Sequence, residues 1–257
     1  MTQARANQPT PLQVVAPVAD VLDRPNGARI RQMLYGETGM LLEEADGYRR
    51  VRATKDGYVG YVRADRLGEA SPATHKVLSL ATHLYTKPDF KSKDAASLSF
   101  GSQVTVLDRD GAFSRVKTGH FIPTVHLAPA RAKFGDPAAI AELFLGTPYL
   151  WGGNSRLGID CSGLVQTAAL ACGVPCPGDT GDQVAELGHA VPTHASLQRG
   201  DVIFWEGHVA MMVNERRIIH ANAHHMSVAF EPLNEAIKRI AEQGDGDVIA
   251  RRRMDLR

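Results

Sequence analysis

The pattern of secondary-structure signals in the sequence changes near residue 130. Before that point, short strand-like segments alternate with Gly, Asp, Asn and Pro turn signals, whereas later residues are typical first of helices and then of strands. Regularly spaced short strands are typical of small barrels or sandwiches, and helices followed by an antiparallel sheet are typical of an α+β unit. Because 257 residues exceed the length of a typical domain, the sequence predicts several domains.

The β-rich half contains a weak internal repeat. Residues 21–26 are similar to 84–89, and residues 36–51 are paralleled by 101–116, each with an Asp-Gly turn before its last strand. Two tandem barrels of about 55–65 residues account for this repeat. With a joint at 71–73, we expect domains at residues 1–72, 73–130 and 131–257.

Local signals predict the elements of the last domain. Helix caps, Pro and Gly positions and apolar spacing favour helices at 136–145 and 161–172. Apolar segments with strand character follow Asp201. The expected strands are 202–205, 208–213, 217–220 and 226–230.

Charge and hydropathy exclude several partners. Lys and Arg number 29 and Asp and Glu number 28, so a net charge of +1 gives no electrostatic case for nucleic acid or for an anionic membrane. The longest uncharged stretch, 161–178, is interrupted by Gly and Pro and cannot form a membrane span. The apolar patch at 14–19 is broken by Pro17 and follows a weak cationic region, unlike a signal peptide. We therefore expect a cytoplasmic location.

Cys161 has the surroundings of a nucleophile. It stands between Asp160 and Ser162, where a Gly-rich loop at 151–154 meets the start of a helix. A helix N-terminus stabilises a thiolate, so we expect Cys161 to be activated there. The alternative is a buried, inert cysteine, which fits Cys172 and Cys176.

The other two cysteines carry no comparable signal. Three cysteines are too few and too clustered for a disulfide scaffold, and a metal site on Cys172 and Cys176 would need further ligands at suitable spacing. A reducing compartment is the simpler interpretation.

Two histidines supply a candidate base. His208 opens one predicted strand and His220 ends the next, so a hairpin that turns at 214–216 would bring them together. A nucleophilic cysteine needs a base, and the base needs an orienting partner. Either histidine alone could instead be structural, and His224 and His225 are expected in a loop.

Five ordered motifs in the last domain carry a resemblance to a known family. They are YLWGG at 149–153, DCSGLV at 160–165, GDVIF at 200–204, HVA at 208–210 and IHA at 219–221. Together they resemble the NlpC family of papain-like bacterial cell-wall peptidases. The resemblance implies an α+β papain-like domain with Cys161 as nucleophile, His208 as general base and His220 as the residue that orients it. It implies neither a metal nor an organic cofactor.

The β-rich half is similar to the tandem bacterial SH3-like domains of the dipeptidyl-peptidase VI type in this family. That type implies a substrate class: peptidoglycan tripeptides or tetrapeptides with a free L-Ala amine, cut between γ-D-Glu and the diamino acid during cell-wall recycling. The amine would be bound by Asp160, with Asp23 and Tyr58 of the first barrel as weaker candidates. A turn Asp and a core Tyr are equally good interpretations of those two.

The remaining candidate contacts also follow from the resemblance. Tyr149, Trp151 and Ser162 would line the cleft. Residues 177–180 resemble a substrate-side Arg-Asp-Ser segment, in which Asp179 and Thr180 are retained or similar but Gly178 replaces the Arg, so carboxylate recognition there would lack its guanidinium. An inactive binding module and an acyltransferase on the same scaffold are the alternative functions.

Overall fold

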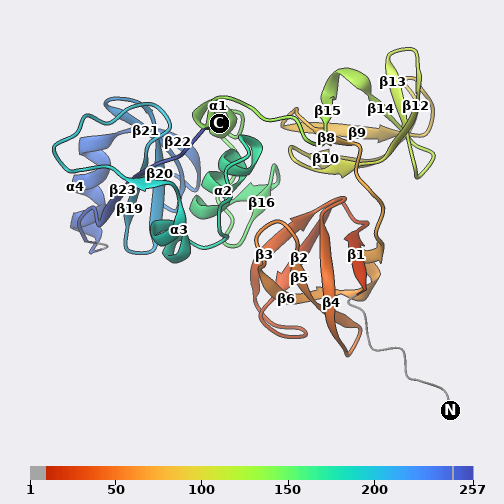
Figure 1. The fold of residues 1–257 in the computed structure, drawn as a ribbon, viewed down its shortest axis with the longest axis horizontal. Coiled ribbons are helices and arrows are strands. Elements are labelled where there is room, and N and C mark those ends of the chain that lie inside the picture. Colours follow the sequence, from red (N-terminus) through yellow and green to blue (C-terminus); the bar gives the residue numbers. More distant parts are fainter. Residues whose placement is uncertain (1–9, 245, 257) are drawn as a thin grey trace. The chain divides into compact units, whose positions relative to one another are not determined.

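The computed structural model describes residues 10–244 and 246–256 and divides the chain into two compact units, 1–130 and 131–257 (Figure 1). The weak cationic region before residue 10 lies outside the described residues. Within the described residues, no helix is long and apolar enough to cross a membrane.

The first unit begins with a seven-stranded antiparallel sheet in the order β3-β2-β6-β5-β4-β1-β7. Its members are β1 Pro11–Val14, β2 Val18–Leu22, β3 Arg29–Leu34, β4 Thr38–Ala45, β5 Tyr48–Ala53, β6 Val59–Arg63, and β7 Leu67–Glu69 after the 3-10 turn Ala64–Arg66. Asp46 and Gly47 both have positive φ, which gives the tight β4–β5 turn expected of an Asp-Gly pair. The sheet encloses its own core, which includes Val14, Met33 and Val62.

A second group of strands follows in the same unit and has a separate core around Val77, Leu98 and Ile122. It comprises β8 His75–Val77, β9 Ala81–Tyr85, β10 Asp94–Ser99, β11 Gln103–Val104, β12 Val106–Asp110, β13 Phe113–Val116, β14 Phe121–Pro123, and β15 Leu127–Pro129 after the 3-10 turn Thr124–His126. They form one sheet of five strands and one of three.

The second unit has a six-stranded antiparallel sheet in the order β18-β23-β19-β20-β21-β22. Its strands are β18 His189–Ala190, β19 Val202–Trp205, β20 His208–Asn214, β21 Arg217–Asn222, β22 Ser227–Pro232 and β23 Ala250–Arg253. The short pair β16 Asn154–Ser155 and β17 Gly158–Ile159 precedes the helix that carries Cys161. The four strands predicted from the sequence are confirmed, and β18 and β23 were missed.

Helices cover both faces of this sheet (Figure 1). The helices of this unit are α1 Pro137–Glu142, α2 Cys161–Ala171, α3 Thr180–Glu186 and α4 Leu233–Gln243, of which α3 contacts α2. Alternate residues of β19 and β20, together with Ile218 of β21, pack with the apolar face of α4, whereas α1 and α2 contact β20 and β21. All four residues of β19 are therefore buried, and the strand lacks the apolar-polar alternation of a one-sided sheet. The predicted α1 and α2 are confirmed, while α3 and α4 were missed.

Candidate active site

The start of α2 is fixed by Asp160, its N-cap residue. Asp160 Oδ1 accepts hydrogen bonds from Gly163 N at 2.6 Å and Ser162 Oγ at 3.2 Å, and Oδ2 accepts from Gly152 N at 2.9 Å. An N-cap carboxylate satisfies helix N–H groups that otherwise lack partners. Asp160 thus joins the Gly-rich loop to the helix and holds Cys161 at the first helical position.

Burial has the largest effect on the pKa of the Cys161 thiol. Burial, followed by the negative charge of Asp160, raises its pKa to about 11, although the backbone N–H of Val209, the Thr180 hydroxyl and the Ser162 N–H act in the opposite direction. The helix start lowers the pKa as expected, through the Ser162 N–H, but the net shift is upward, so activation of the resting thiol by the helix start alone is not what the structure shows. Removal of water disfavours the charged form more than the helix N-terminus favours it.

The β20–β21 hairpin brings His208 and His220 together, as the sequence predicted. His208 Nε2 lies 2.9 Å from His220 Nδ1. Burial, then the proximity of His220 and Arg239, lowers the pKa of His208 to about 3, against the attraction of Glu231. The adjacent Val209 N–H points to the thiol of Cys161, so the start of β20 lies beside the start of α2. Burial thus shifts both groups towards their neutral forms, the thiol and the uncharged imidazole.

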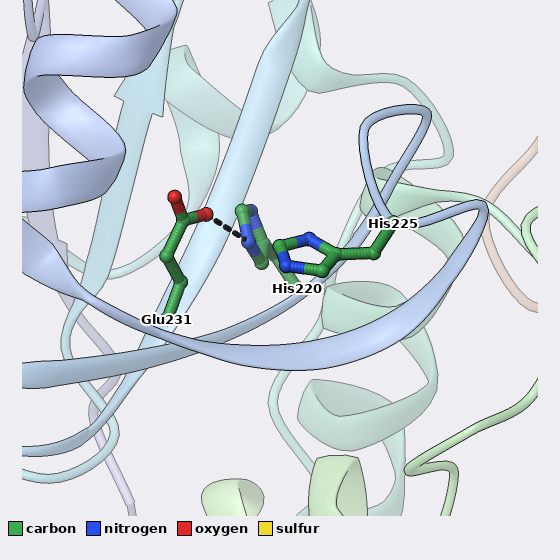
Figure 2. A group of neighbouring side chains, drawn as sticks. All are labelled: His220, His225 and Glu231. Carbon is green, nitrogen blue, oxygen red and sulfur yellow. Dashed lines mark ion pairs between the residues drawn. The ribbon is translucent and has the colours of Figure 1, made fainter.

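Glu231 and Arg239 extend this pair and were missed by the sequence analysis. His220 Nε2 lies 3.0 Å from Glu231 Oε2 (Figure 2). Arg239 of α4 binds both oxygens of the same carboxylate, from Nε at 2.9 Å and from Nη2 at 2.7 Å. Burial alone would raise the pKa of Glu231, but His220 and Arg239 together hold it well below its usual range. Glu231 is therefore an anion.

His220, His225 and Glu231 also bring their ligand atoms within 4.8 Å of one another (Figure 2). Two imidazoles and a carboxylate are donors that Zn²⁺ accepts. However, Arg239 already holds both carboxylate oxygens, and His220 Nδ1 faces His208. A cation would have to displace a guanidinium, so we interpret Glu231 as the ion-pair partner of Arg239 beside His220 and not as a metal ligand. The neighbouring Asn222 bonds to His225 and not to His208.

Two candidate cleft residues differ in exposure. Tyr149 is partly buried, and burial, followed by the charges of Cys161 and Asp160, raises its pKa to about 12. Its hydroxyl consequently stays protonated at neutral pH and lies near the nucleophile. Trp151 is 68% exposed, on the loop before α2. Both positions are compatible with contacts to a peptide, which remain predictions.

Residues 177–180 are tied to the start of α2. Gln183 Nε2 donates to Ser162 O and to Pro177 O, both at 2.9 Å. Thr180 Oγ1 lies 4.0 Å from Cys161 Sγ, and Asp179 is exposed. Ser162 is buried and its hydroxyl donates a hydrogen bond to Asp160, so we expect Ser162 to position Asp160 and not to line the cleft.

The two candidates in the first unit have local partners. Asp23 Oδ1 accepts from Ala28 N at 2.9 Å, and Oδ2 pairs with Arg24 at 3.0 Å. Tyr58 packs against the first β core with its ring 5.8 Å from the Arg31 guanidinium. These contacts agree with the turn and core interpretations, and a role in substrate binding stays a prediction.

We expect alkylation of Cys161 to report the neutral resting pair. The rate of reaction with iodoacetamide should be low at pH 7 and should rise with pH towards the pKa of about 11. A mass-spectrometric time course over pH 4–10, with peptide mapping to separate Cys161 from Cys172 and Cys176, measures it. A high, constant rate between pH 4 and 8 would show a resting thiolate-imidazolium pair and contradict this prediction.

Two parts of the chain match known protein families. Residues 146–241 match the NlpC/P60 family, and residues 21–67 match the bacterial dipeptidyl-peptidase Sh3 domain. The first match contains Cys161, His208, His220, Glu231 and Arg239.

Curated relatives and a solved structure show the same similarity. The chain is 30% identical over 207 residues to a gamma-D-glutamyl-L-lysine dipeptidyl-peptidase of Bacillus cereus, and the match covers 70% of this chain and 61% of that protein. It is 25% identical over 252 residues to dipeptidyl-peptidase 6 of Lysinibacillus sphaericus, covering 86% and 91%. A crystal structure of an NlpC/P60 family protein from Bacillus cereus shares the fold, with a TM-score of 0.79 at 21% identity and coverage of 96% and 100%.

Proposed function

We propose that this chain, which carries an NlpC/P60 cysteine peptidase domain and a bacterial dipeptidyl-peptidase Sh3 domain, cleaves peptidoglycan stem peptides between γ-D-Glu and the diamino acid. The observation that carries the proposal is the placement of Cys161 at the start of α2, beside the strand whose His208 is hydrogen-bonded to His220. Relatives named gamma-D-glutamyl-L-lysine dipeptidyl-peptidase and dipeptidyl-peptidase 6 support this substrate class.

In the proposed mechanism, Cys161 is the nucleophile and His208 is the general base. His208 takes the thiol proton as sulfur attacks the γ-carbonyl of D-Glu, and the resulting imidazolium protonates the leaving amine as the C–N bond breaks. Water, activated by His208, then hydrolyses the γ-glutamyl thioester and releases L-Ala-γ-D-Glu. Burial raises the pKa of Cys161 and lowers that of His208, which favours the neutral pair at rest, so proton transfer would accompany the attack of sulfur.

The oxyanion would be stabilised by groups already at the site. Backbone N–H groups at the start of α2 would donate to the developing negative charge, and the Tyr149 hydroxyl, whose pKa of about 12 keeps it protonated, would be a further donor. Each such donor is worth on the order of 10²–10³ in rate. Trp151, Asp179 and Thr180 would contact the rest of the peptide.

We further propose that residues 73–130 are a second SH3-like barrel. In both β groups a short strand is followed by a three-residue 3-10 turn and another short strand: β6, 64–66 and β7 in the first, and β14, 124–126 and β15 in the second. Each group also encloses its own core.

The free L-Ala amine would be recognised by Asp160, with Asp23 and Tyr58 of the first barrel as further candidates. Tripeptides and tetrapeptides detached from the wall are suitable substrates for recycling, and we propose that this recycling takes place in the cytoplasm.

The function is tested with L-Ala-γ-D-Glu-diaminopimelate as substrate. We expect mass spectrometry to find L-Ala-γ-D-Glu and free diaminopimelate, and no other cut. Adding a second amine separates the alternatives, because an acyltransferase would move the γ-glutamyl group onto that amine. Binding of the tripeptide without turnover would indicate an inactive binding module and overturn the proposal.

A further inference from the structure

His220 is held on both sides of its ring, and this fixes where its proton lies. Its Nδ1 faces His208 Nε2 at 2.9 Å and its Nε2 faces Glu231 Oε2 at 3.0 Å. The carboxylate lies off the ideal hydrogen-bond direction, yet His220 Nε2 has no better-aligned partner within the part of the chain that the structure describes. The side chain of His220 is completely buried, so water cannot replace that partner.

Register explains why Glu231 reaches this ring. In the β21–β22 ladder, His220 pairs with Ala229, and Glu231 is two residues further along β22. Residues two apart on a strand share a face, so Glu231 and His220 are diagonal neighbours. Arg239, on the helix that follows β22, closes on the carboxylate from the other side, and its Nη1 donates to Gln243 at 2.8 Å.

We propose that Glu231, locked by Arg239, is a positioning residue that sets the tautomers of both histidines; the proposal rests on the function given above. An ionised carboxylate only accepts hydrogen bonds, so it places the proton of neutral His220 on Nε2. The bare Nδ1 must then accept from His208 Nε2–H. This leaves His208 Nδ1 without a proton and available to take the one on Cys161.

The charge of Glu231 also acts during the reaction. When His208 receives the proton of Cys161, a buried imidazolium forms, and burial disfavours it strongly. Glu231 raises the pKa of both histidines against burial, through its contact with His220 and its charge near His208. Arg239 and His225 lower the pKa of His220, so the Glu231 carboxylate offsets their electrostatic effect as well as that of burial. Without an anion at 231, the imidazolium of the transition state would be less stable.

The first test replaces Glu231 by Gln. The amide can turn either its oxygen or its NH₂ group to His220 Nε2, and the negative charge is gone, so the requirement for a proton on Nε2 is removed. We expect kcat for the tripeptide to fall by about 10–100-fold, a range typical of partners that orient a functional histidine, with little change in KM. Glu231→Met combined with Arg239→Met removes both charges at once and leaves no unpaired buried ion.

The tautomers of His208 and His220 can be determined by NMR in the absence of substrate. Long-range ¹H–¹⁵N spectra of histidine-labelled protein at pH 7 distinguish a protonated ring nitrogen from a bare one, with His208→Asn and His220→Asn for assignment. We expect Nε2–H on both rings in the wild type and a population with Nδ1–H in the two Glu231 variants. Glu142→Gln is the matched control, because Glu142 also binds Arg199 through both oxygens, at 2.8 and 3.0 Å, and should leave both tautomers unchanged.

The outcomes separate this proposal from the peptidase function. Nδ1–H rings in the wild type, unchanged tautomers in both Glu231 variants, or shifted tautomers with unchanged kcat would each overturn the positioning role. If the tautomers shift as expected but the wild type does not cleave the tripeptide, the tautomer control by Glu231 stands and the proposed substrate is wrong.

Discussion

Cys161→Ala should abolish hydrolysis of the tripeptide and leave the fold intact. Loss of the thiol removes the bond-forming atom, and loss of a catalytic nucleophile in comparable enzymes lowers kcat by at least about 10⁴-fold. The fold should survive because the Asp160 side chain holds the start of α2. Its hydrogen bonds come from Gly152 N and Gly163 N and do not involve the sulfur of Cys161. Turnover by mass spectrometry and thermal unfolding, measured on the same sample, check both parts.

The other two cysteines are the matched controls. Cys172 and Cys176 are buried, and all three cysteines are free thiols. Cys172→Ala and Cys176→Ala should each lose some stability through a small cavity and retain turnover. Loss of activity at normal stability in either variant would show a functional role for these thiols and contradict the assignment of Cys161 as the sole nucleophile.

Local signals account for the parts of the site that could be predicted. Asp136 caps α1 through Ala139 N, and Asp160 caps α2 through Gly163 N, as Asp before a helix does in general. The His208–His220 contact follows from a short hairpin, in which register depends on neighbouring residues. These features require little information from distant parts of the chain.

The missed features depend on packing. Residues 250–253 include three consecutive arginines and lack an apolar pattern, yet they form β23 between β18 and β19, which are distant in sequence. Glu231 has no local signal of its own; its role depends on the ladder with β21 and on Arg239 of α4. The helix α4 was detectable, because Leu233, Ala236 and Ile240 follow a helical spacing. The low pKa of Glu231 could not be predicted, since it results from two partners brought together by the fold.

Acetylation of the L-Ala amine should lower kcat/KM for the tripeptide by about 100-fold or more, equivalent to roughly 2.7 kcal/mol. Acetylation removes the positive charge and adds bulk where the proposed site provides a carboxylate. Asp160 is buried and accepts two backbone N–H groups and a hydroxyl, and it lies close enough to Tyr149 to raise the pKa of that residue. Steady-state rates for the free and acetylated peptides, at one pH, give the ratio.

Conservative variants identify which side chain causes this selectivity. Asp160→Asn keeps a side-chain oxygen for the N-cap and removes the charge, so a ratio that falls towards one would assign amine recognition to Asp160. An unchanged ratio in that variant and a reduced one in Asp23→Asn or Tyr58→Phe would assign it to the first barrel. Intact sacculi carry the L-Ala nitrogen in an amide and should be poor substrates for the same reason. If sacculi were digested as readily as the free tripeptide, a requirement for the amine would be excluded, and the β-rich unit at 1–130 would be better explained as a part of the chain that binds the wall.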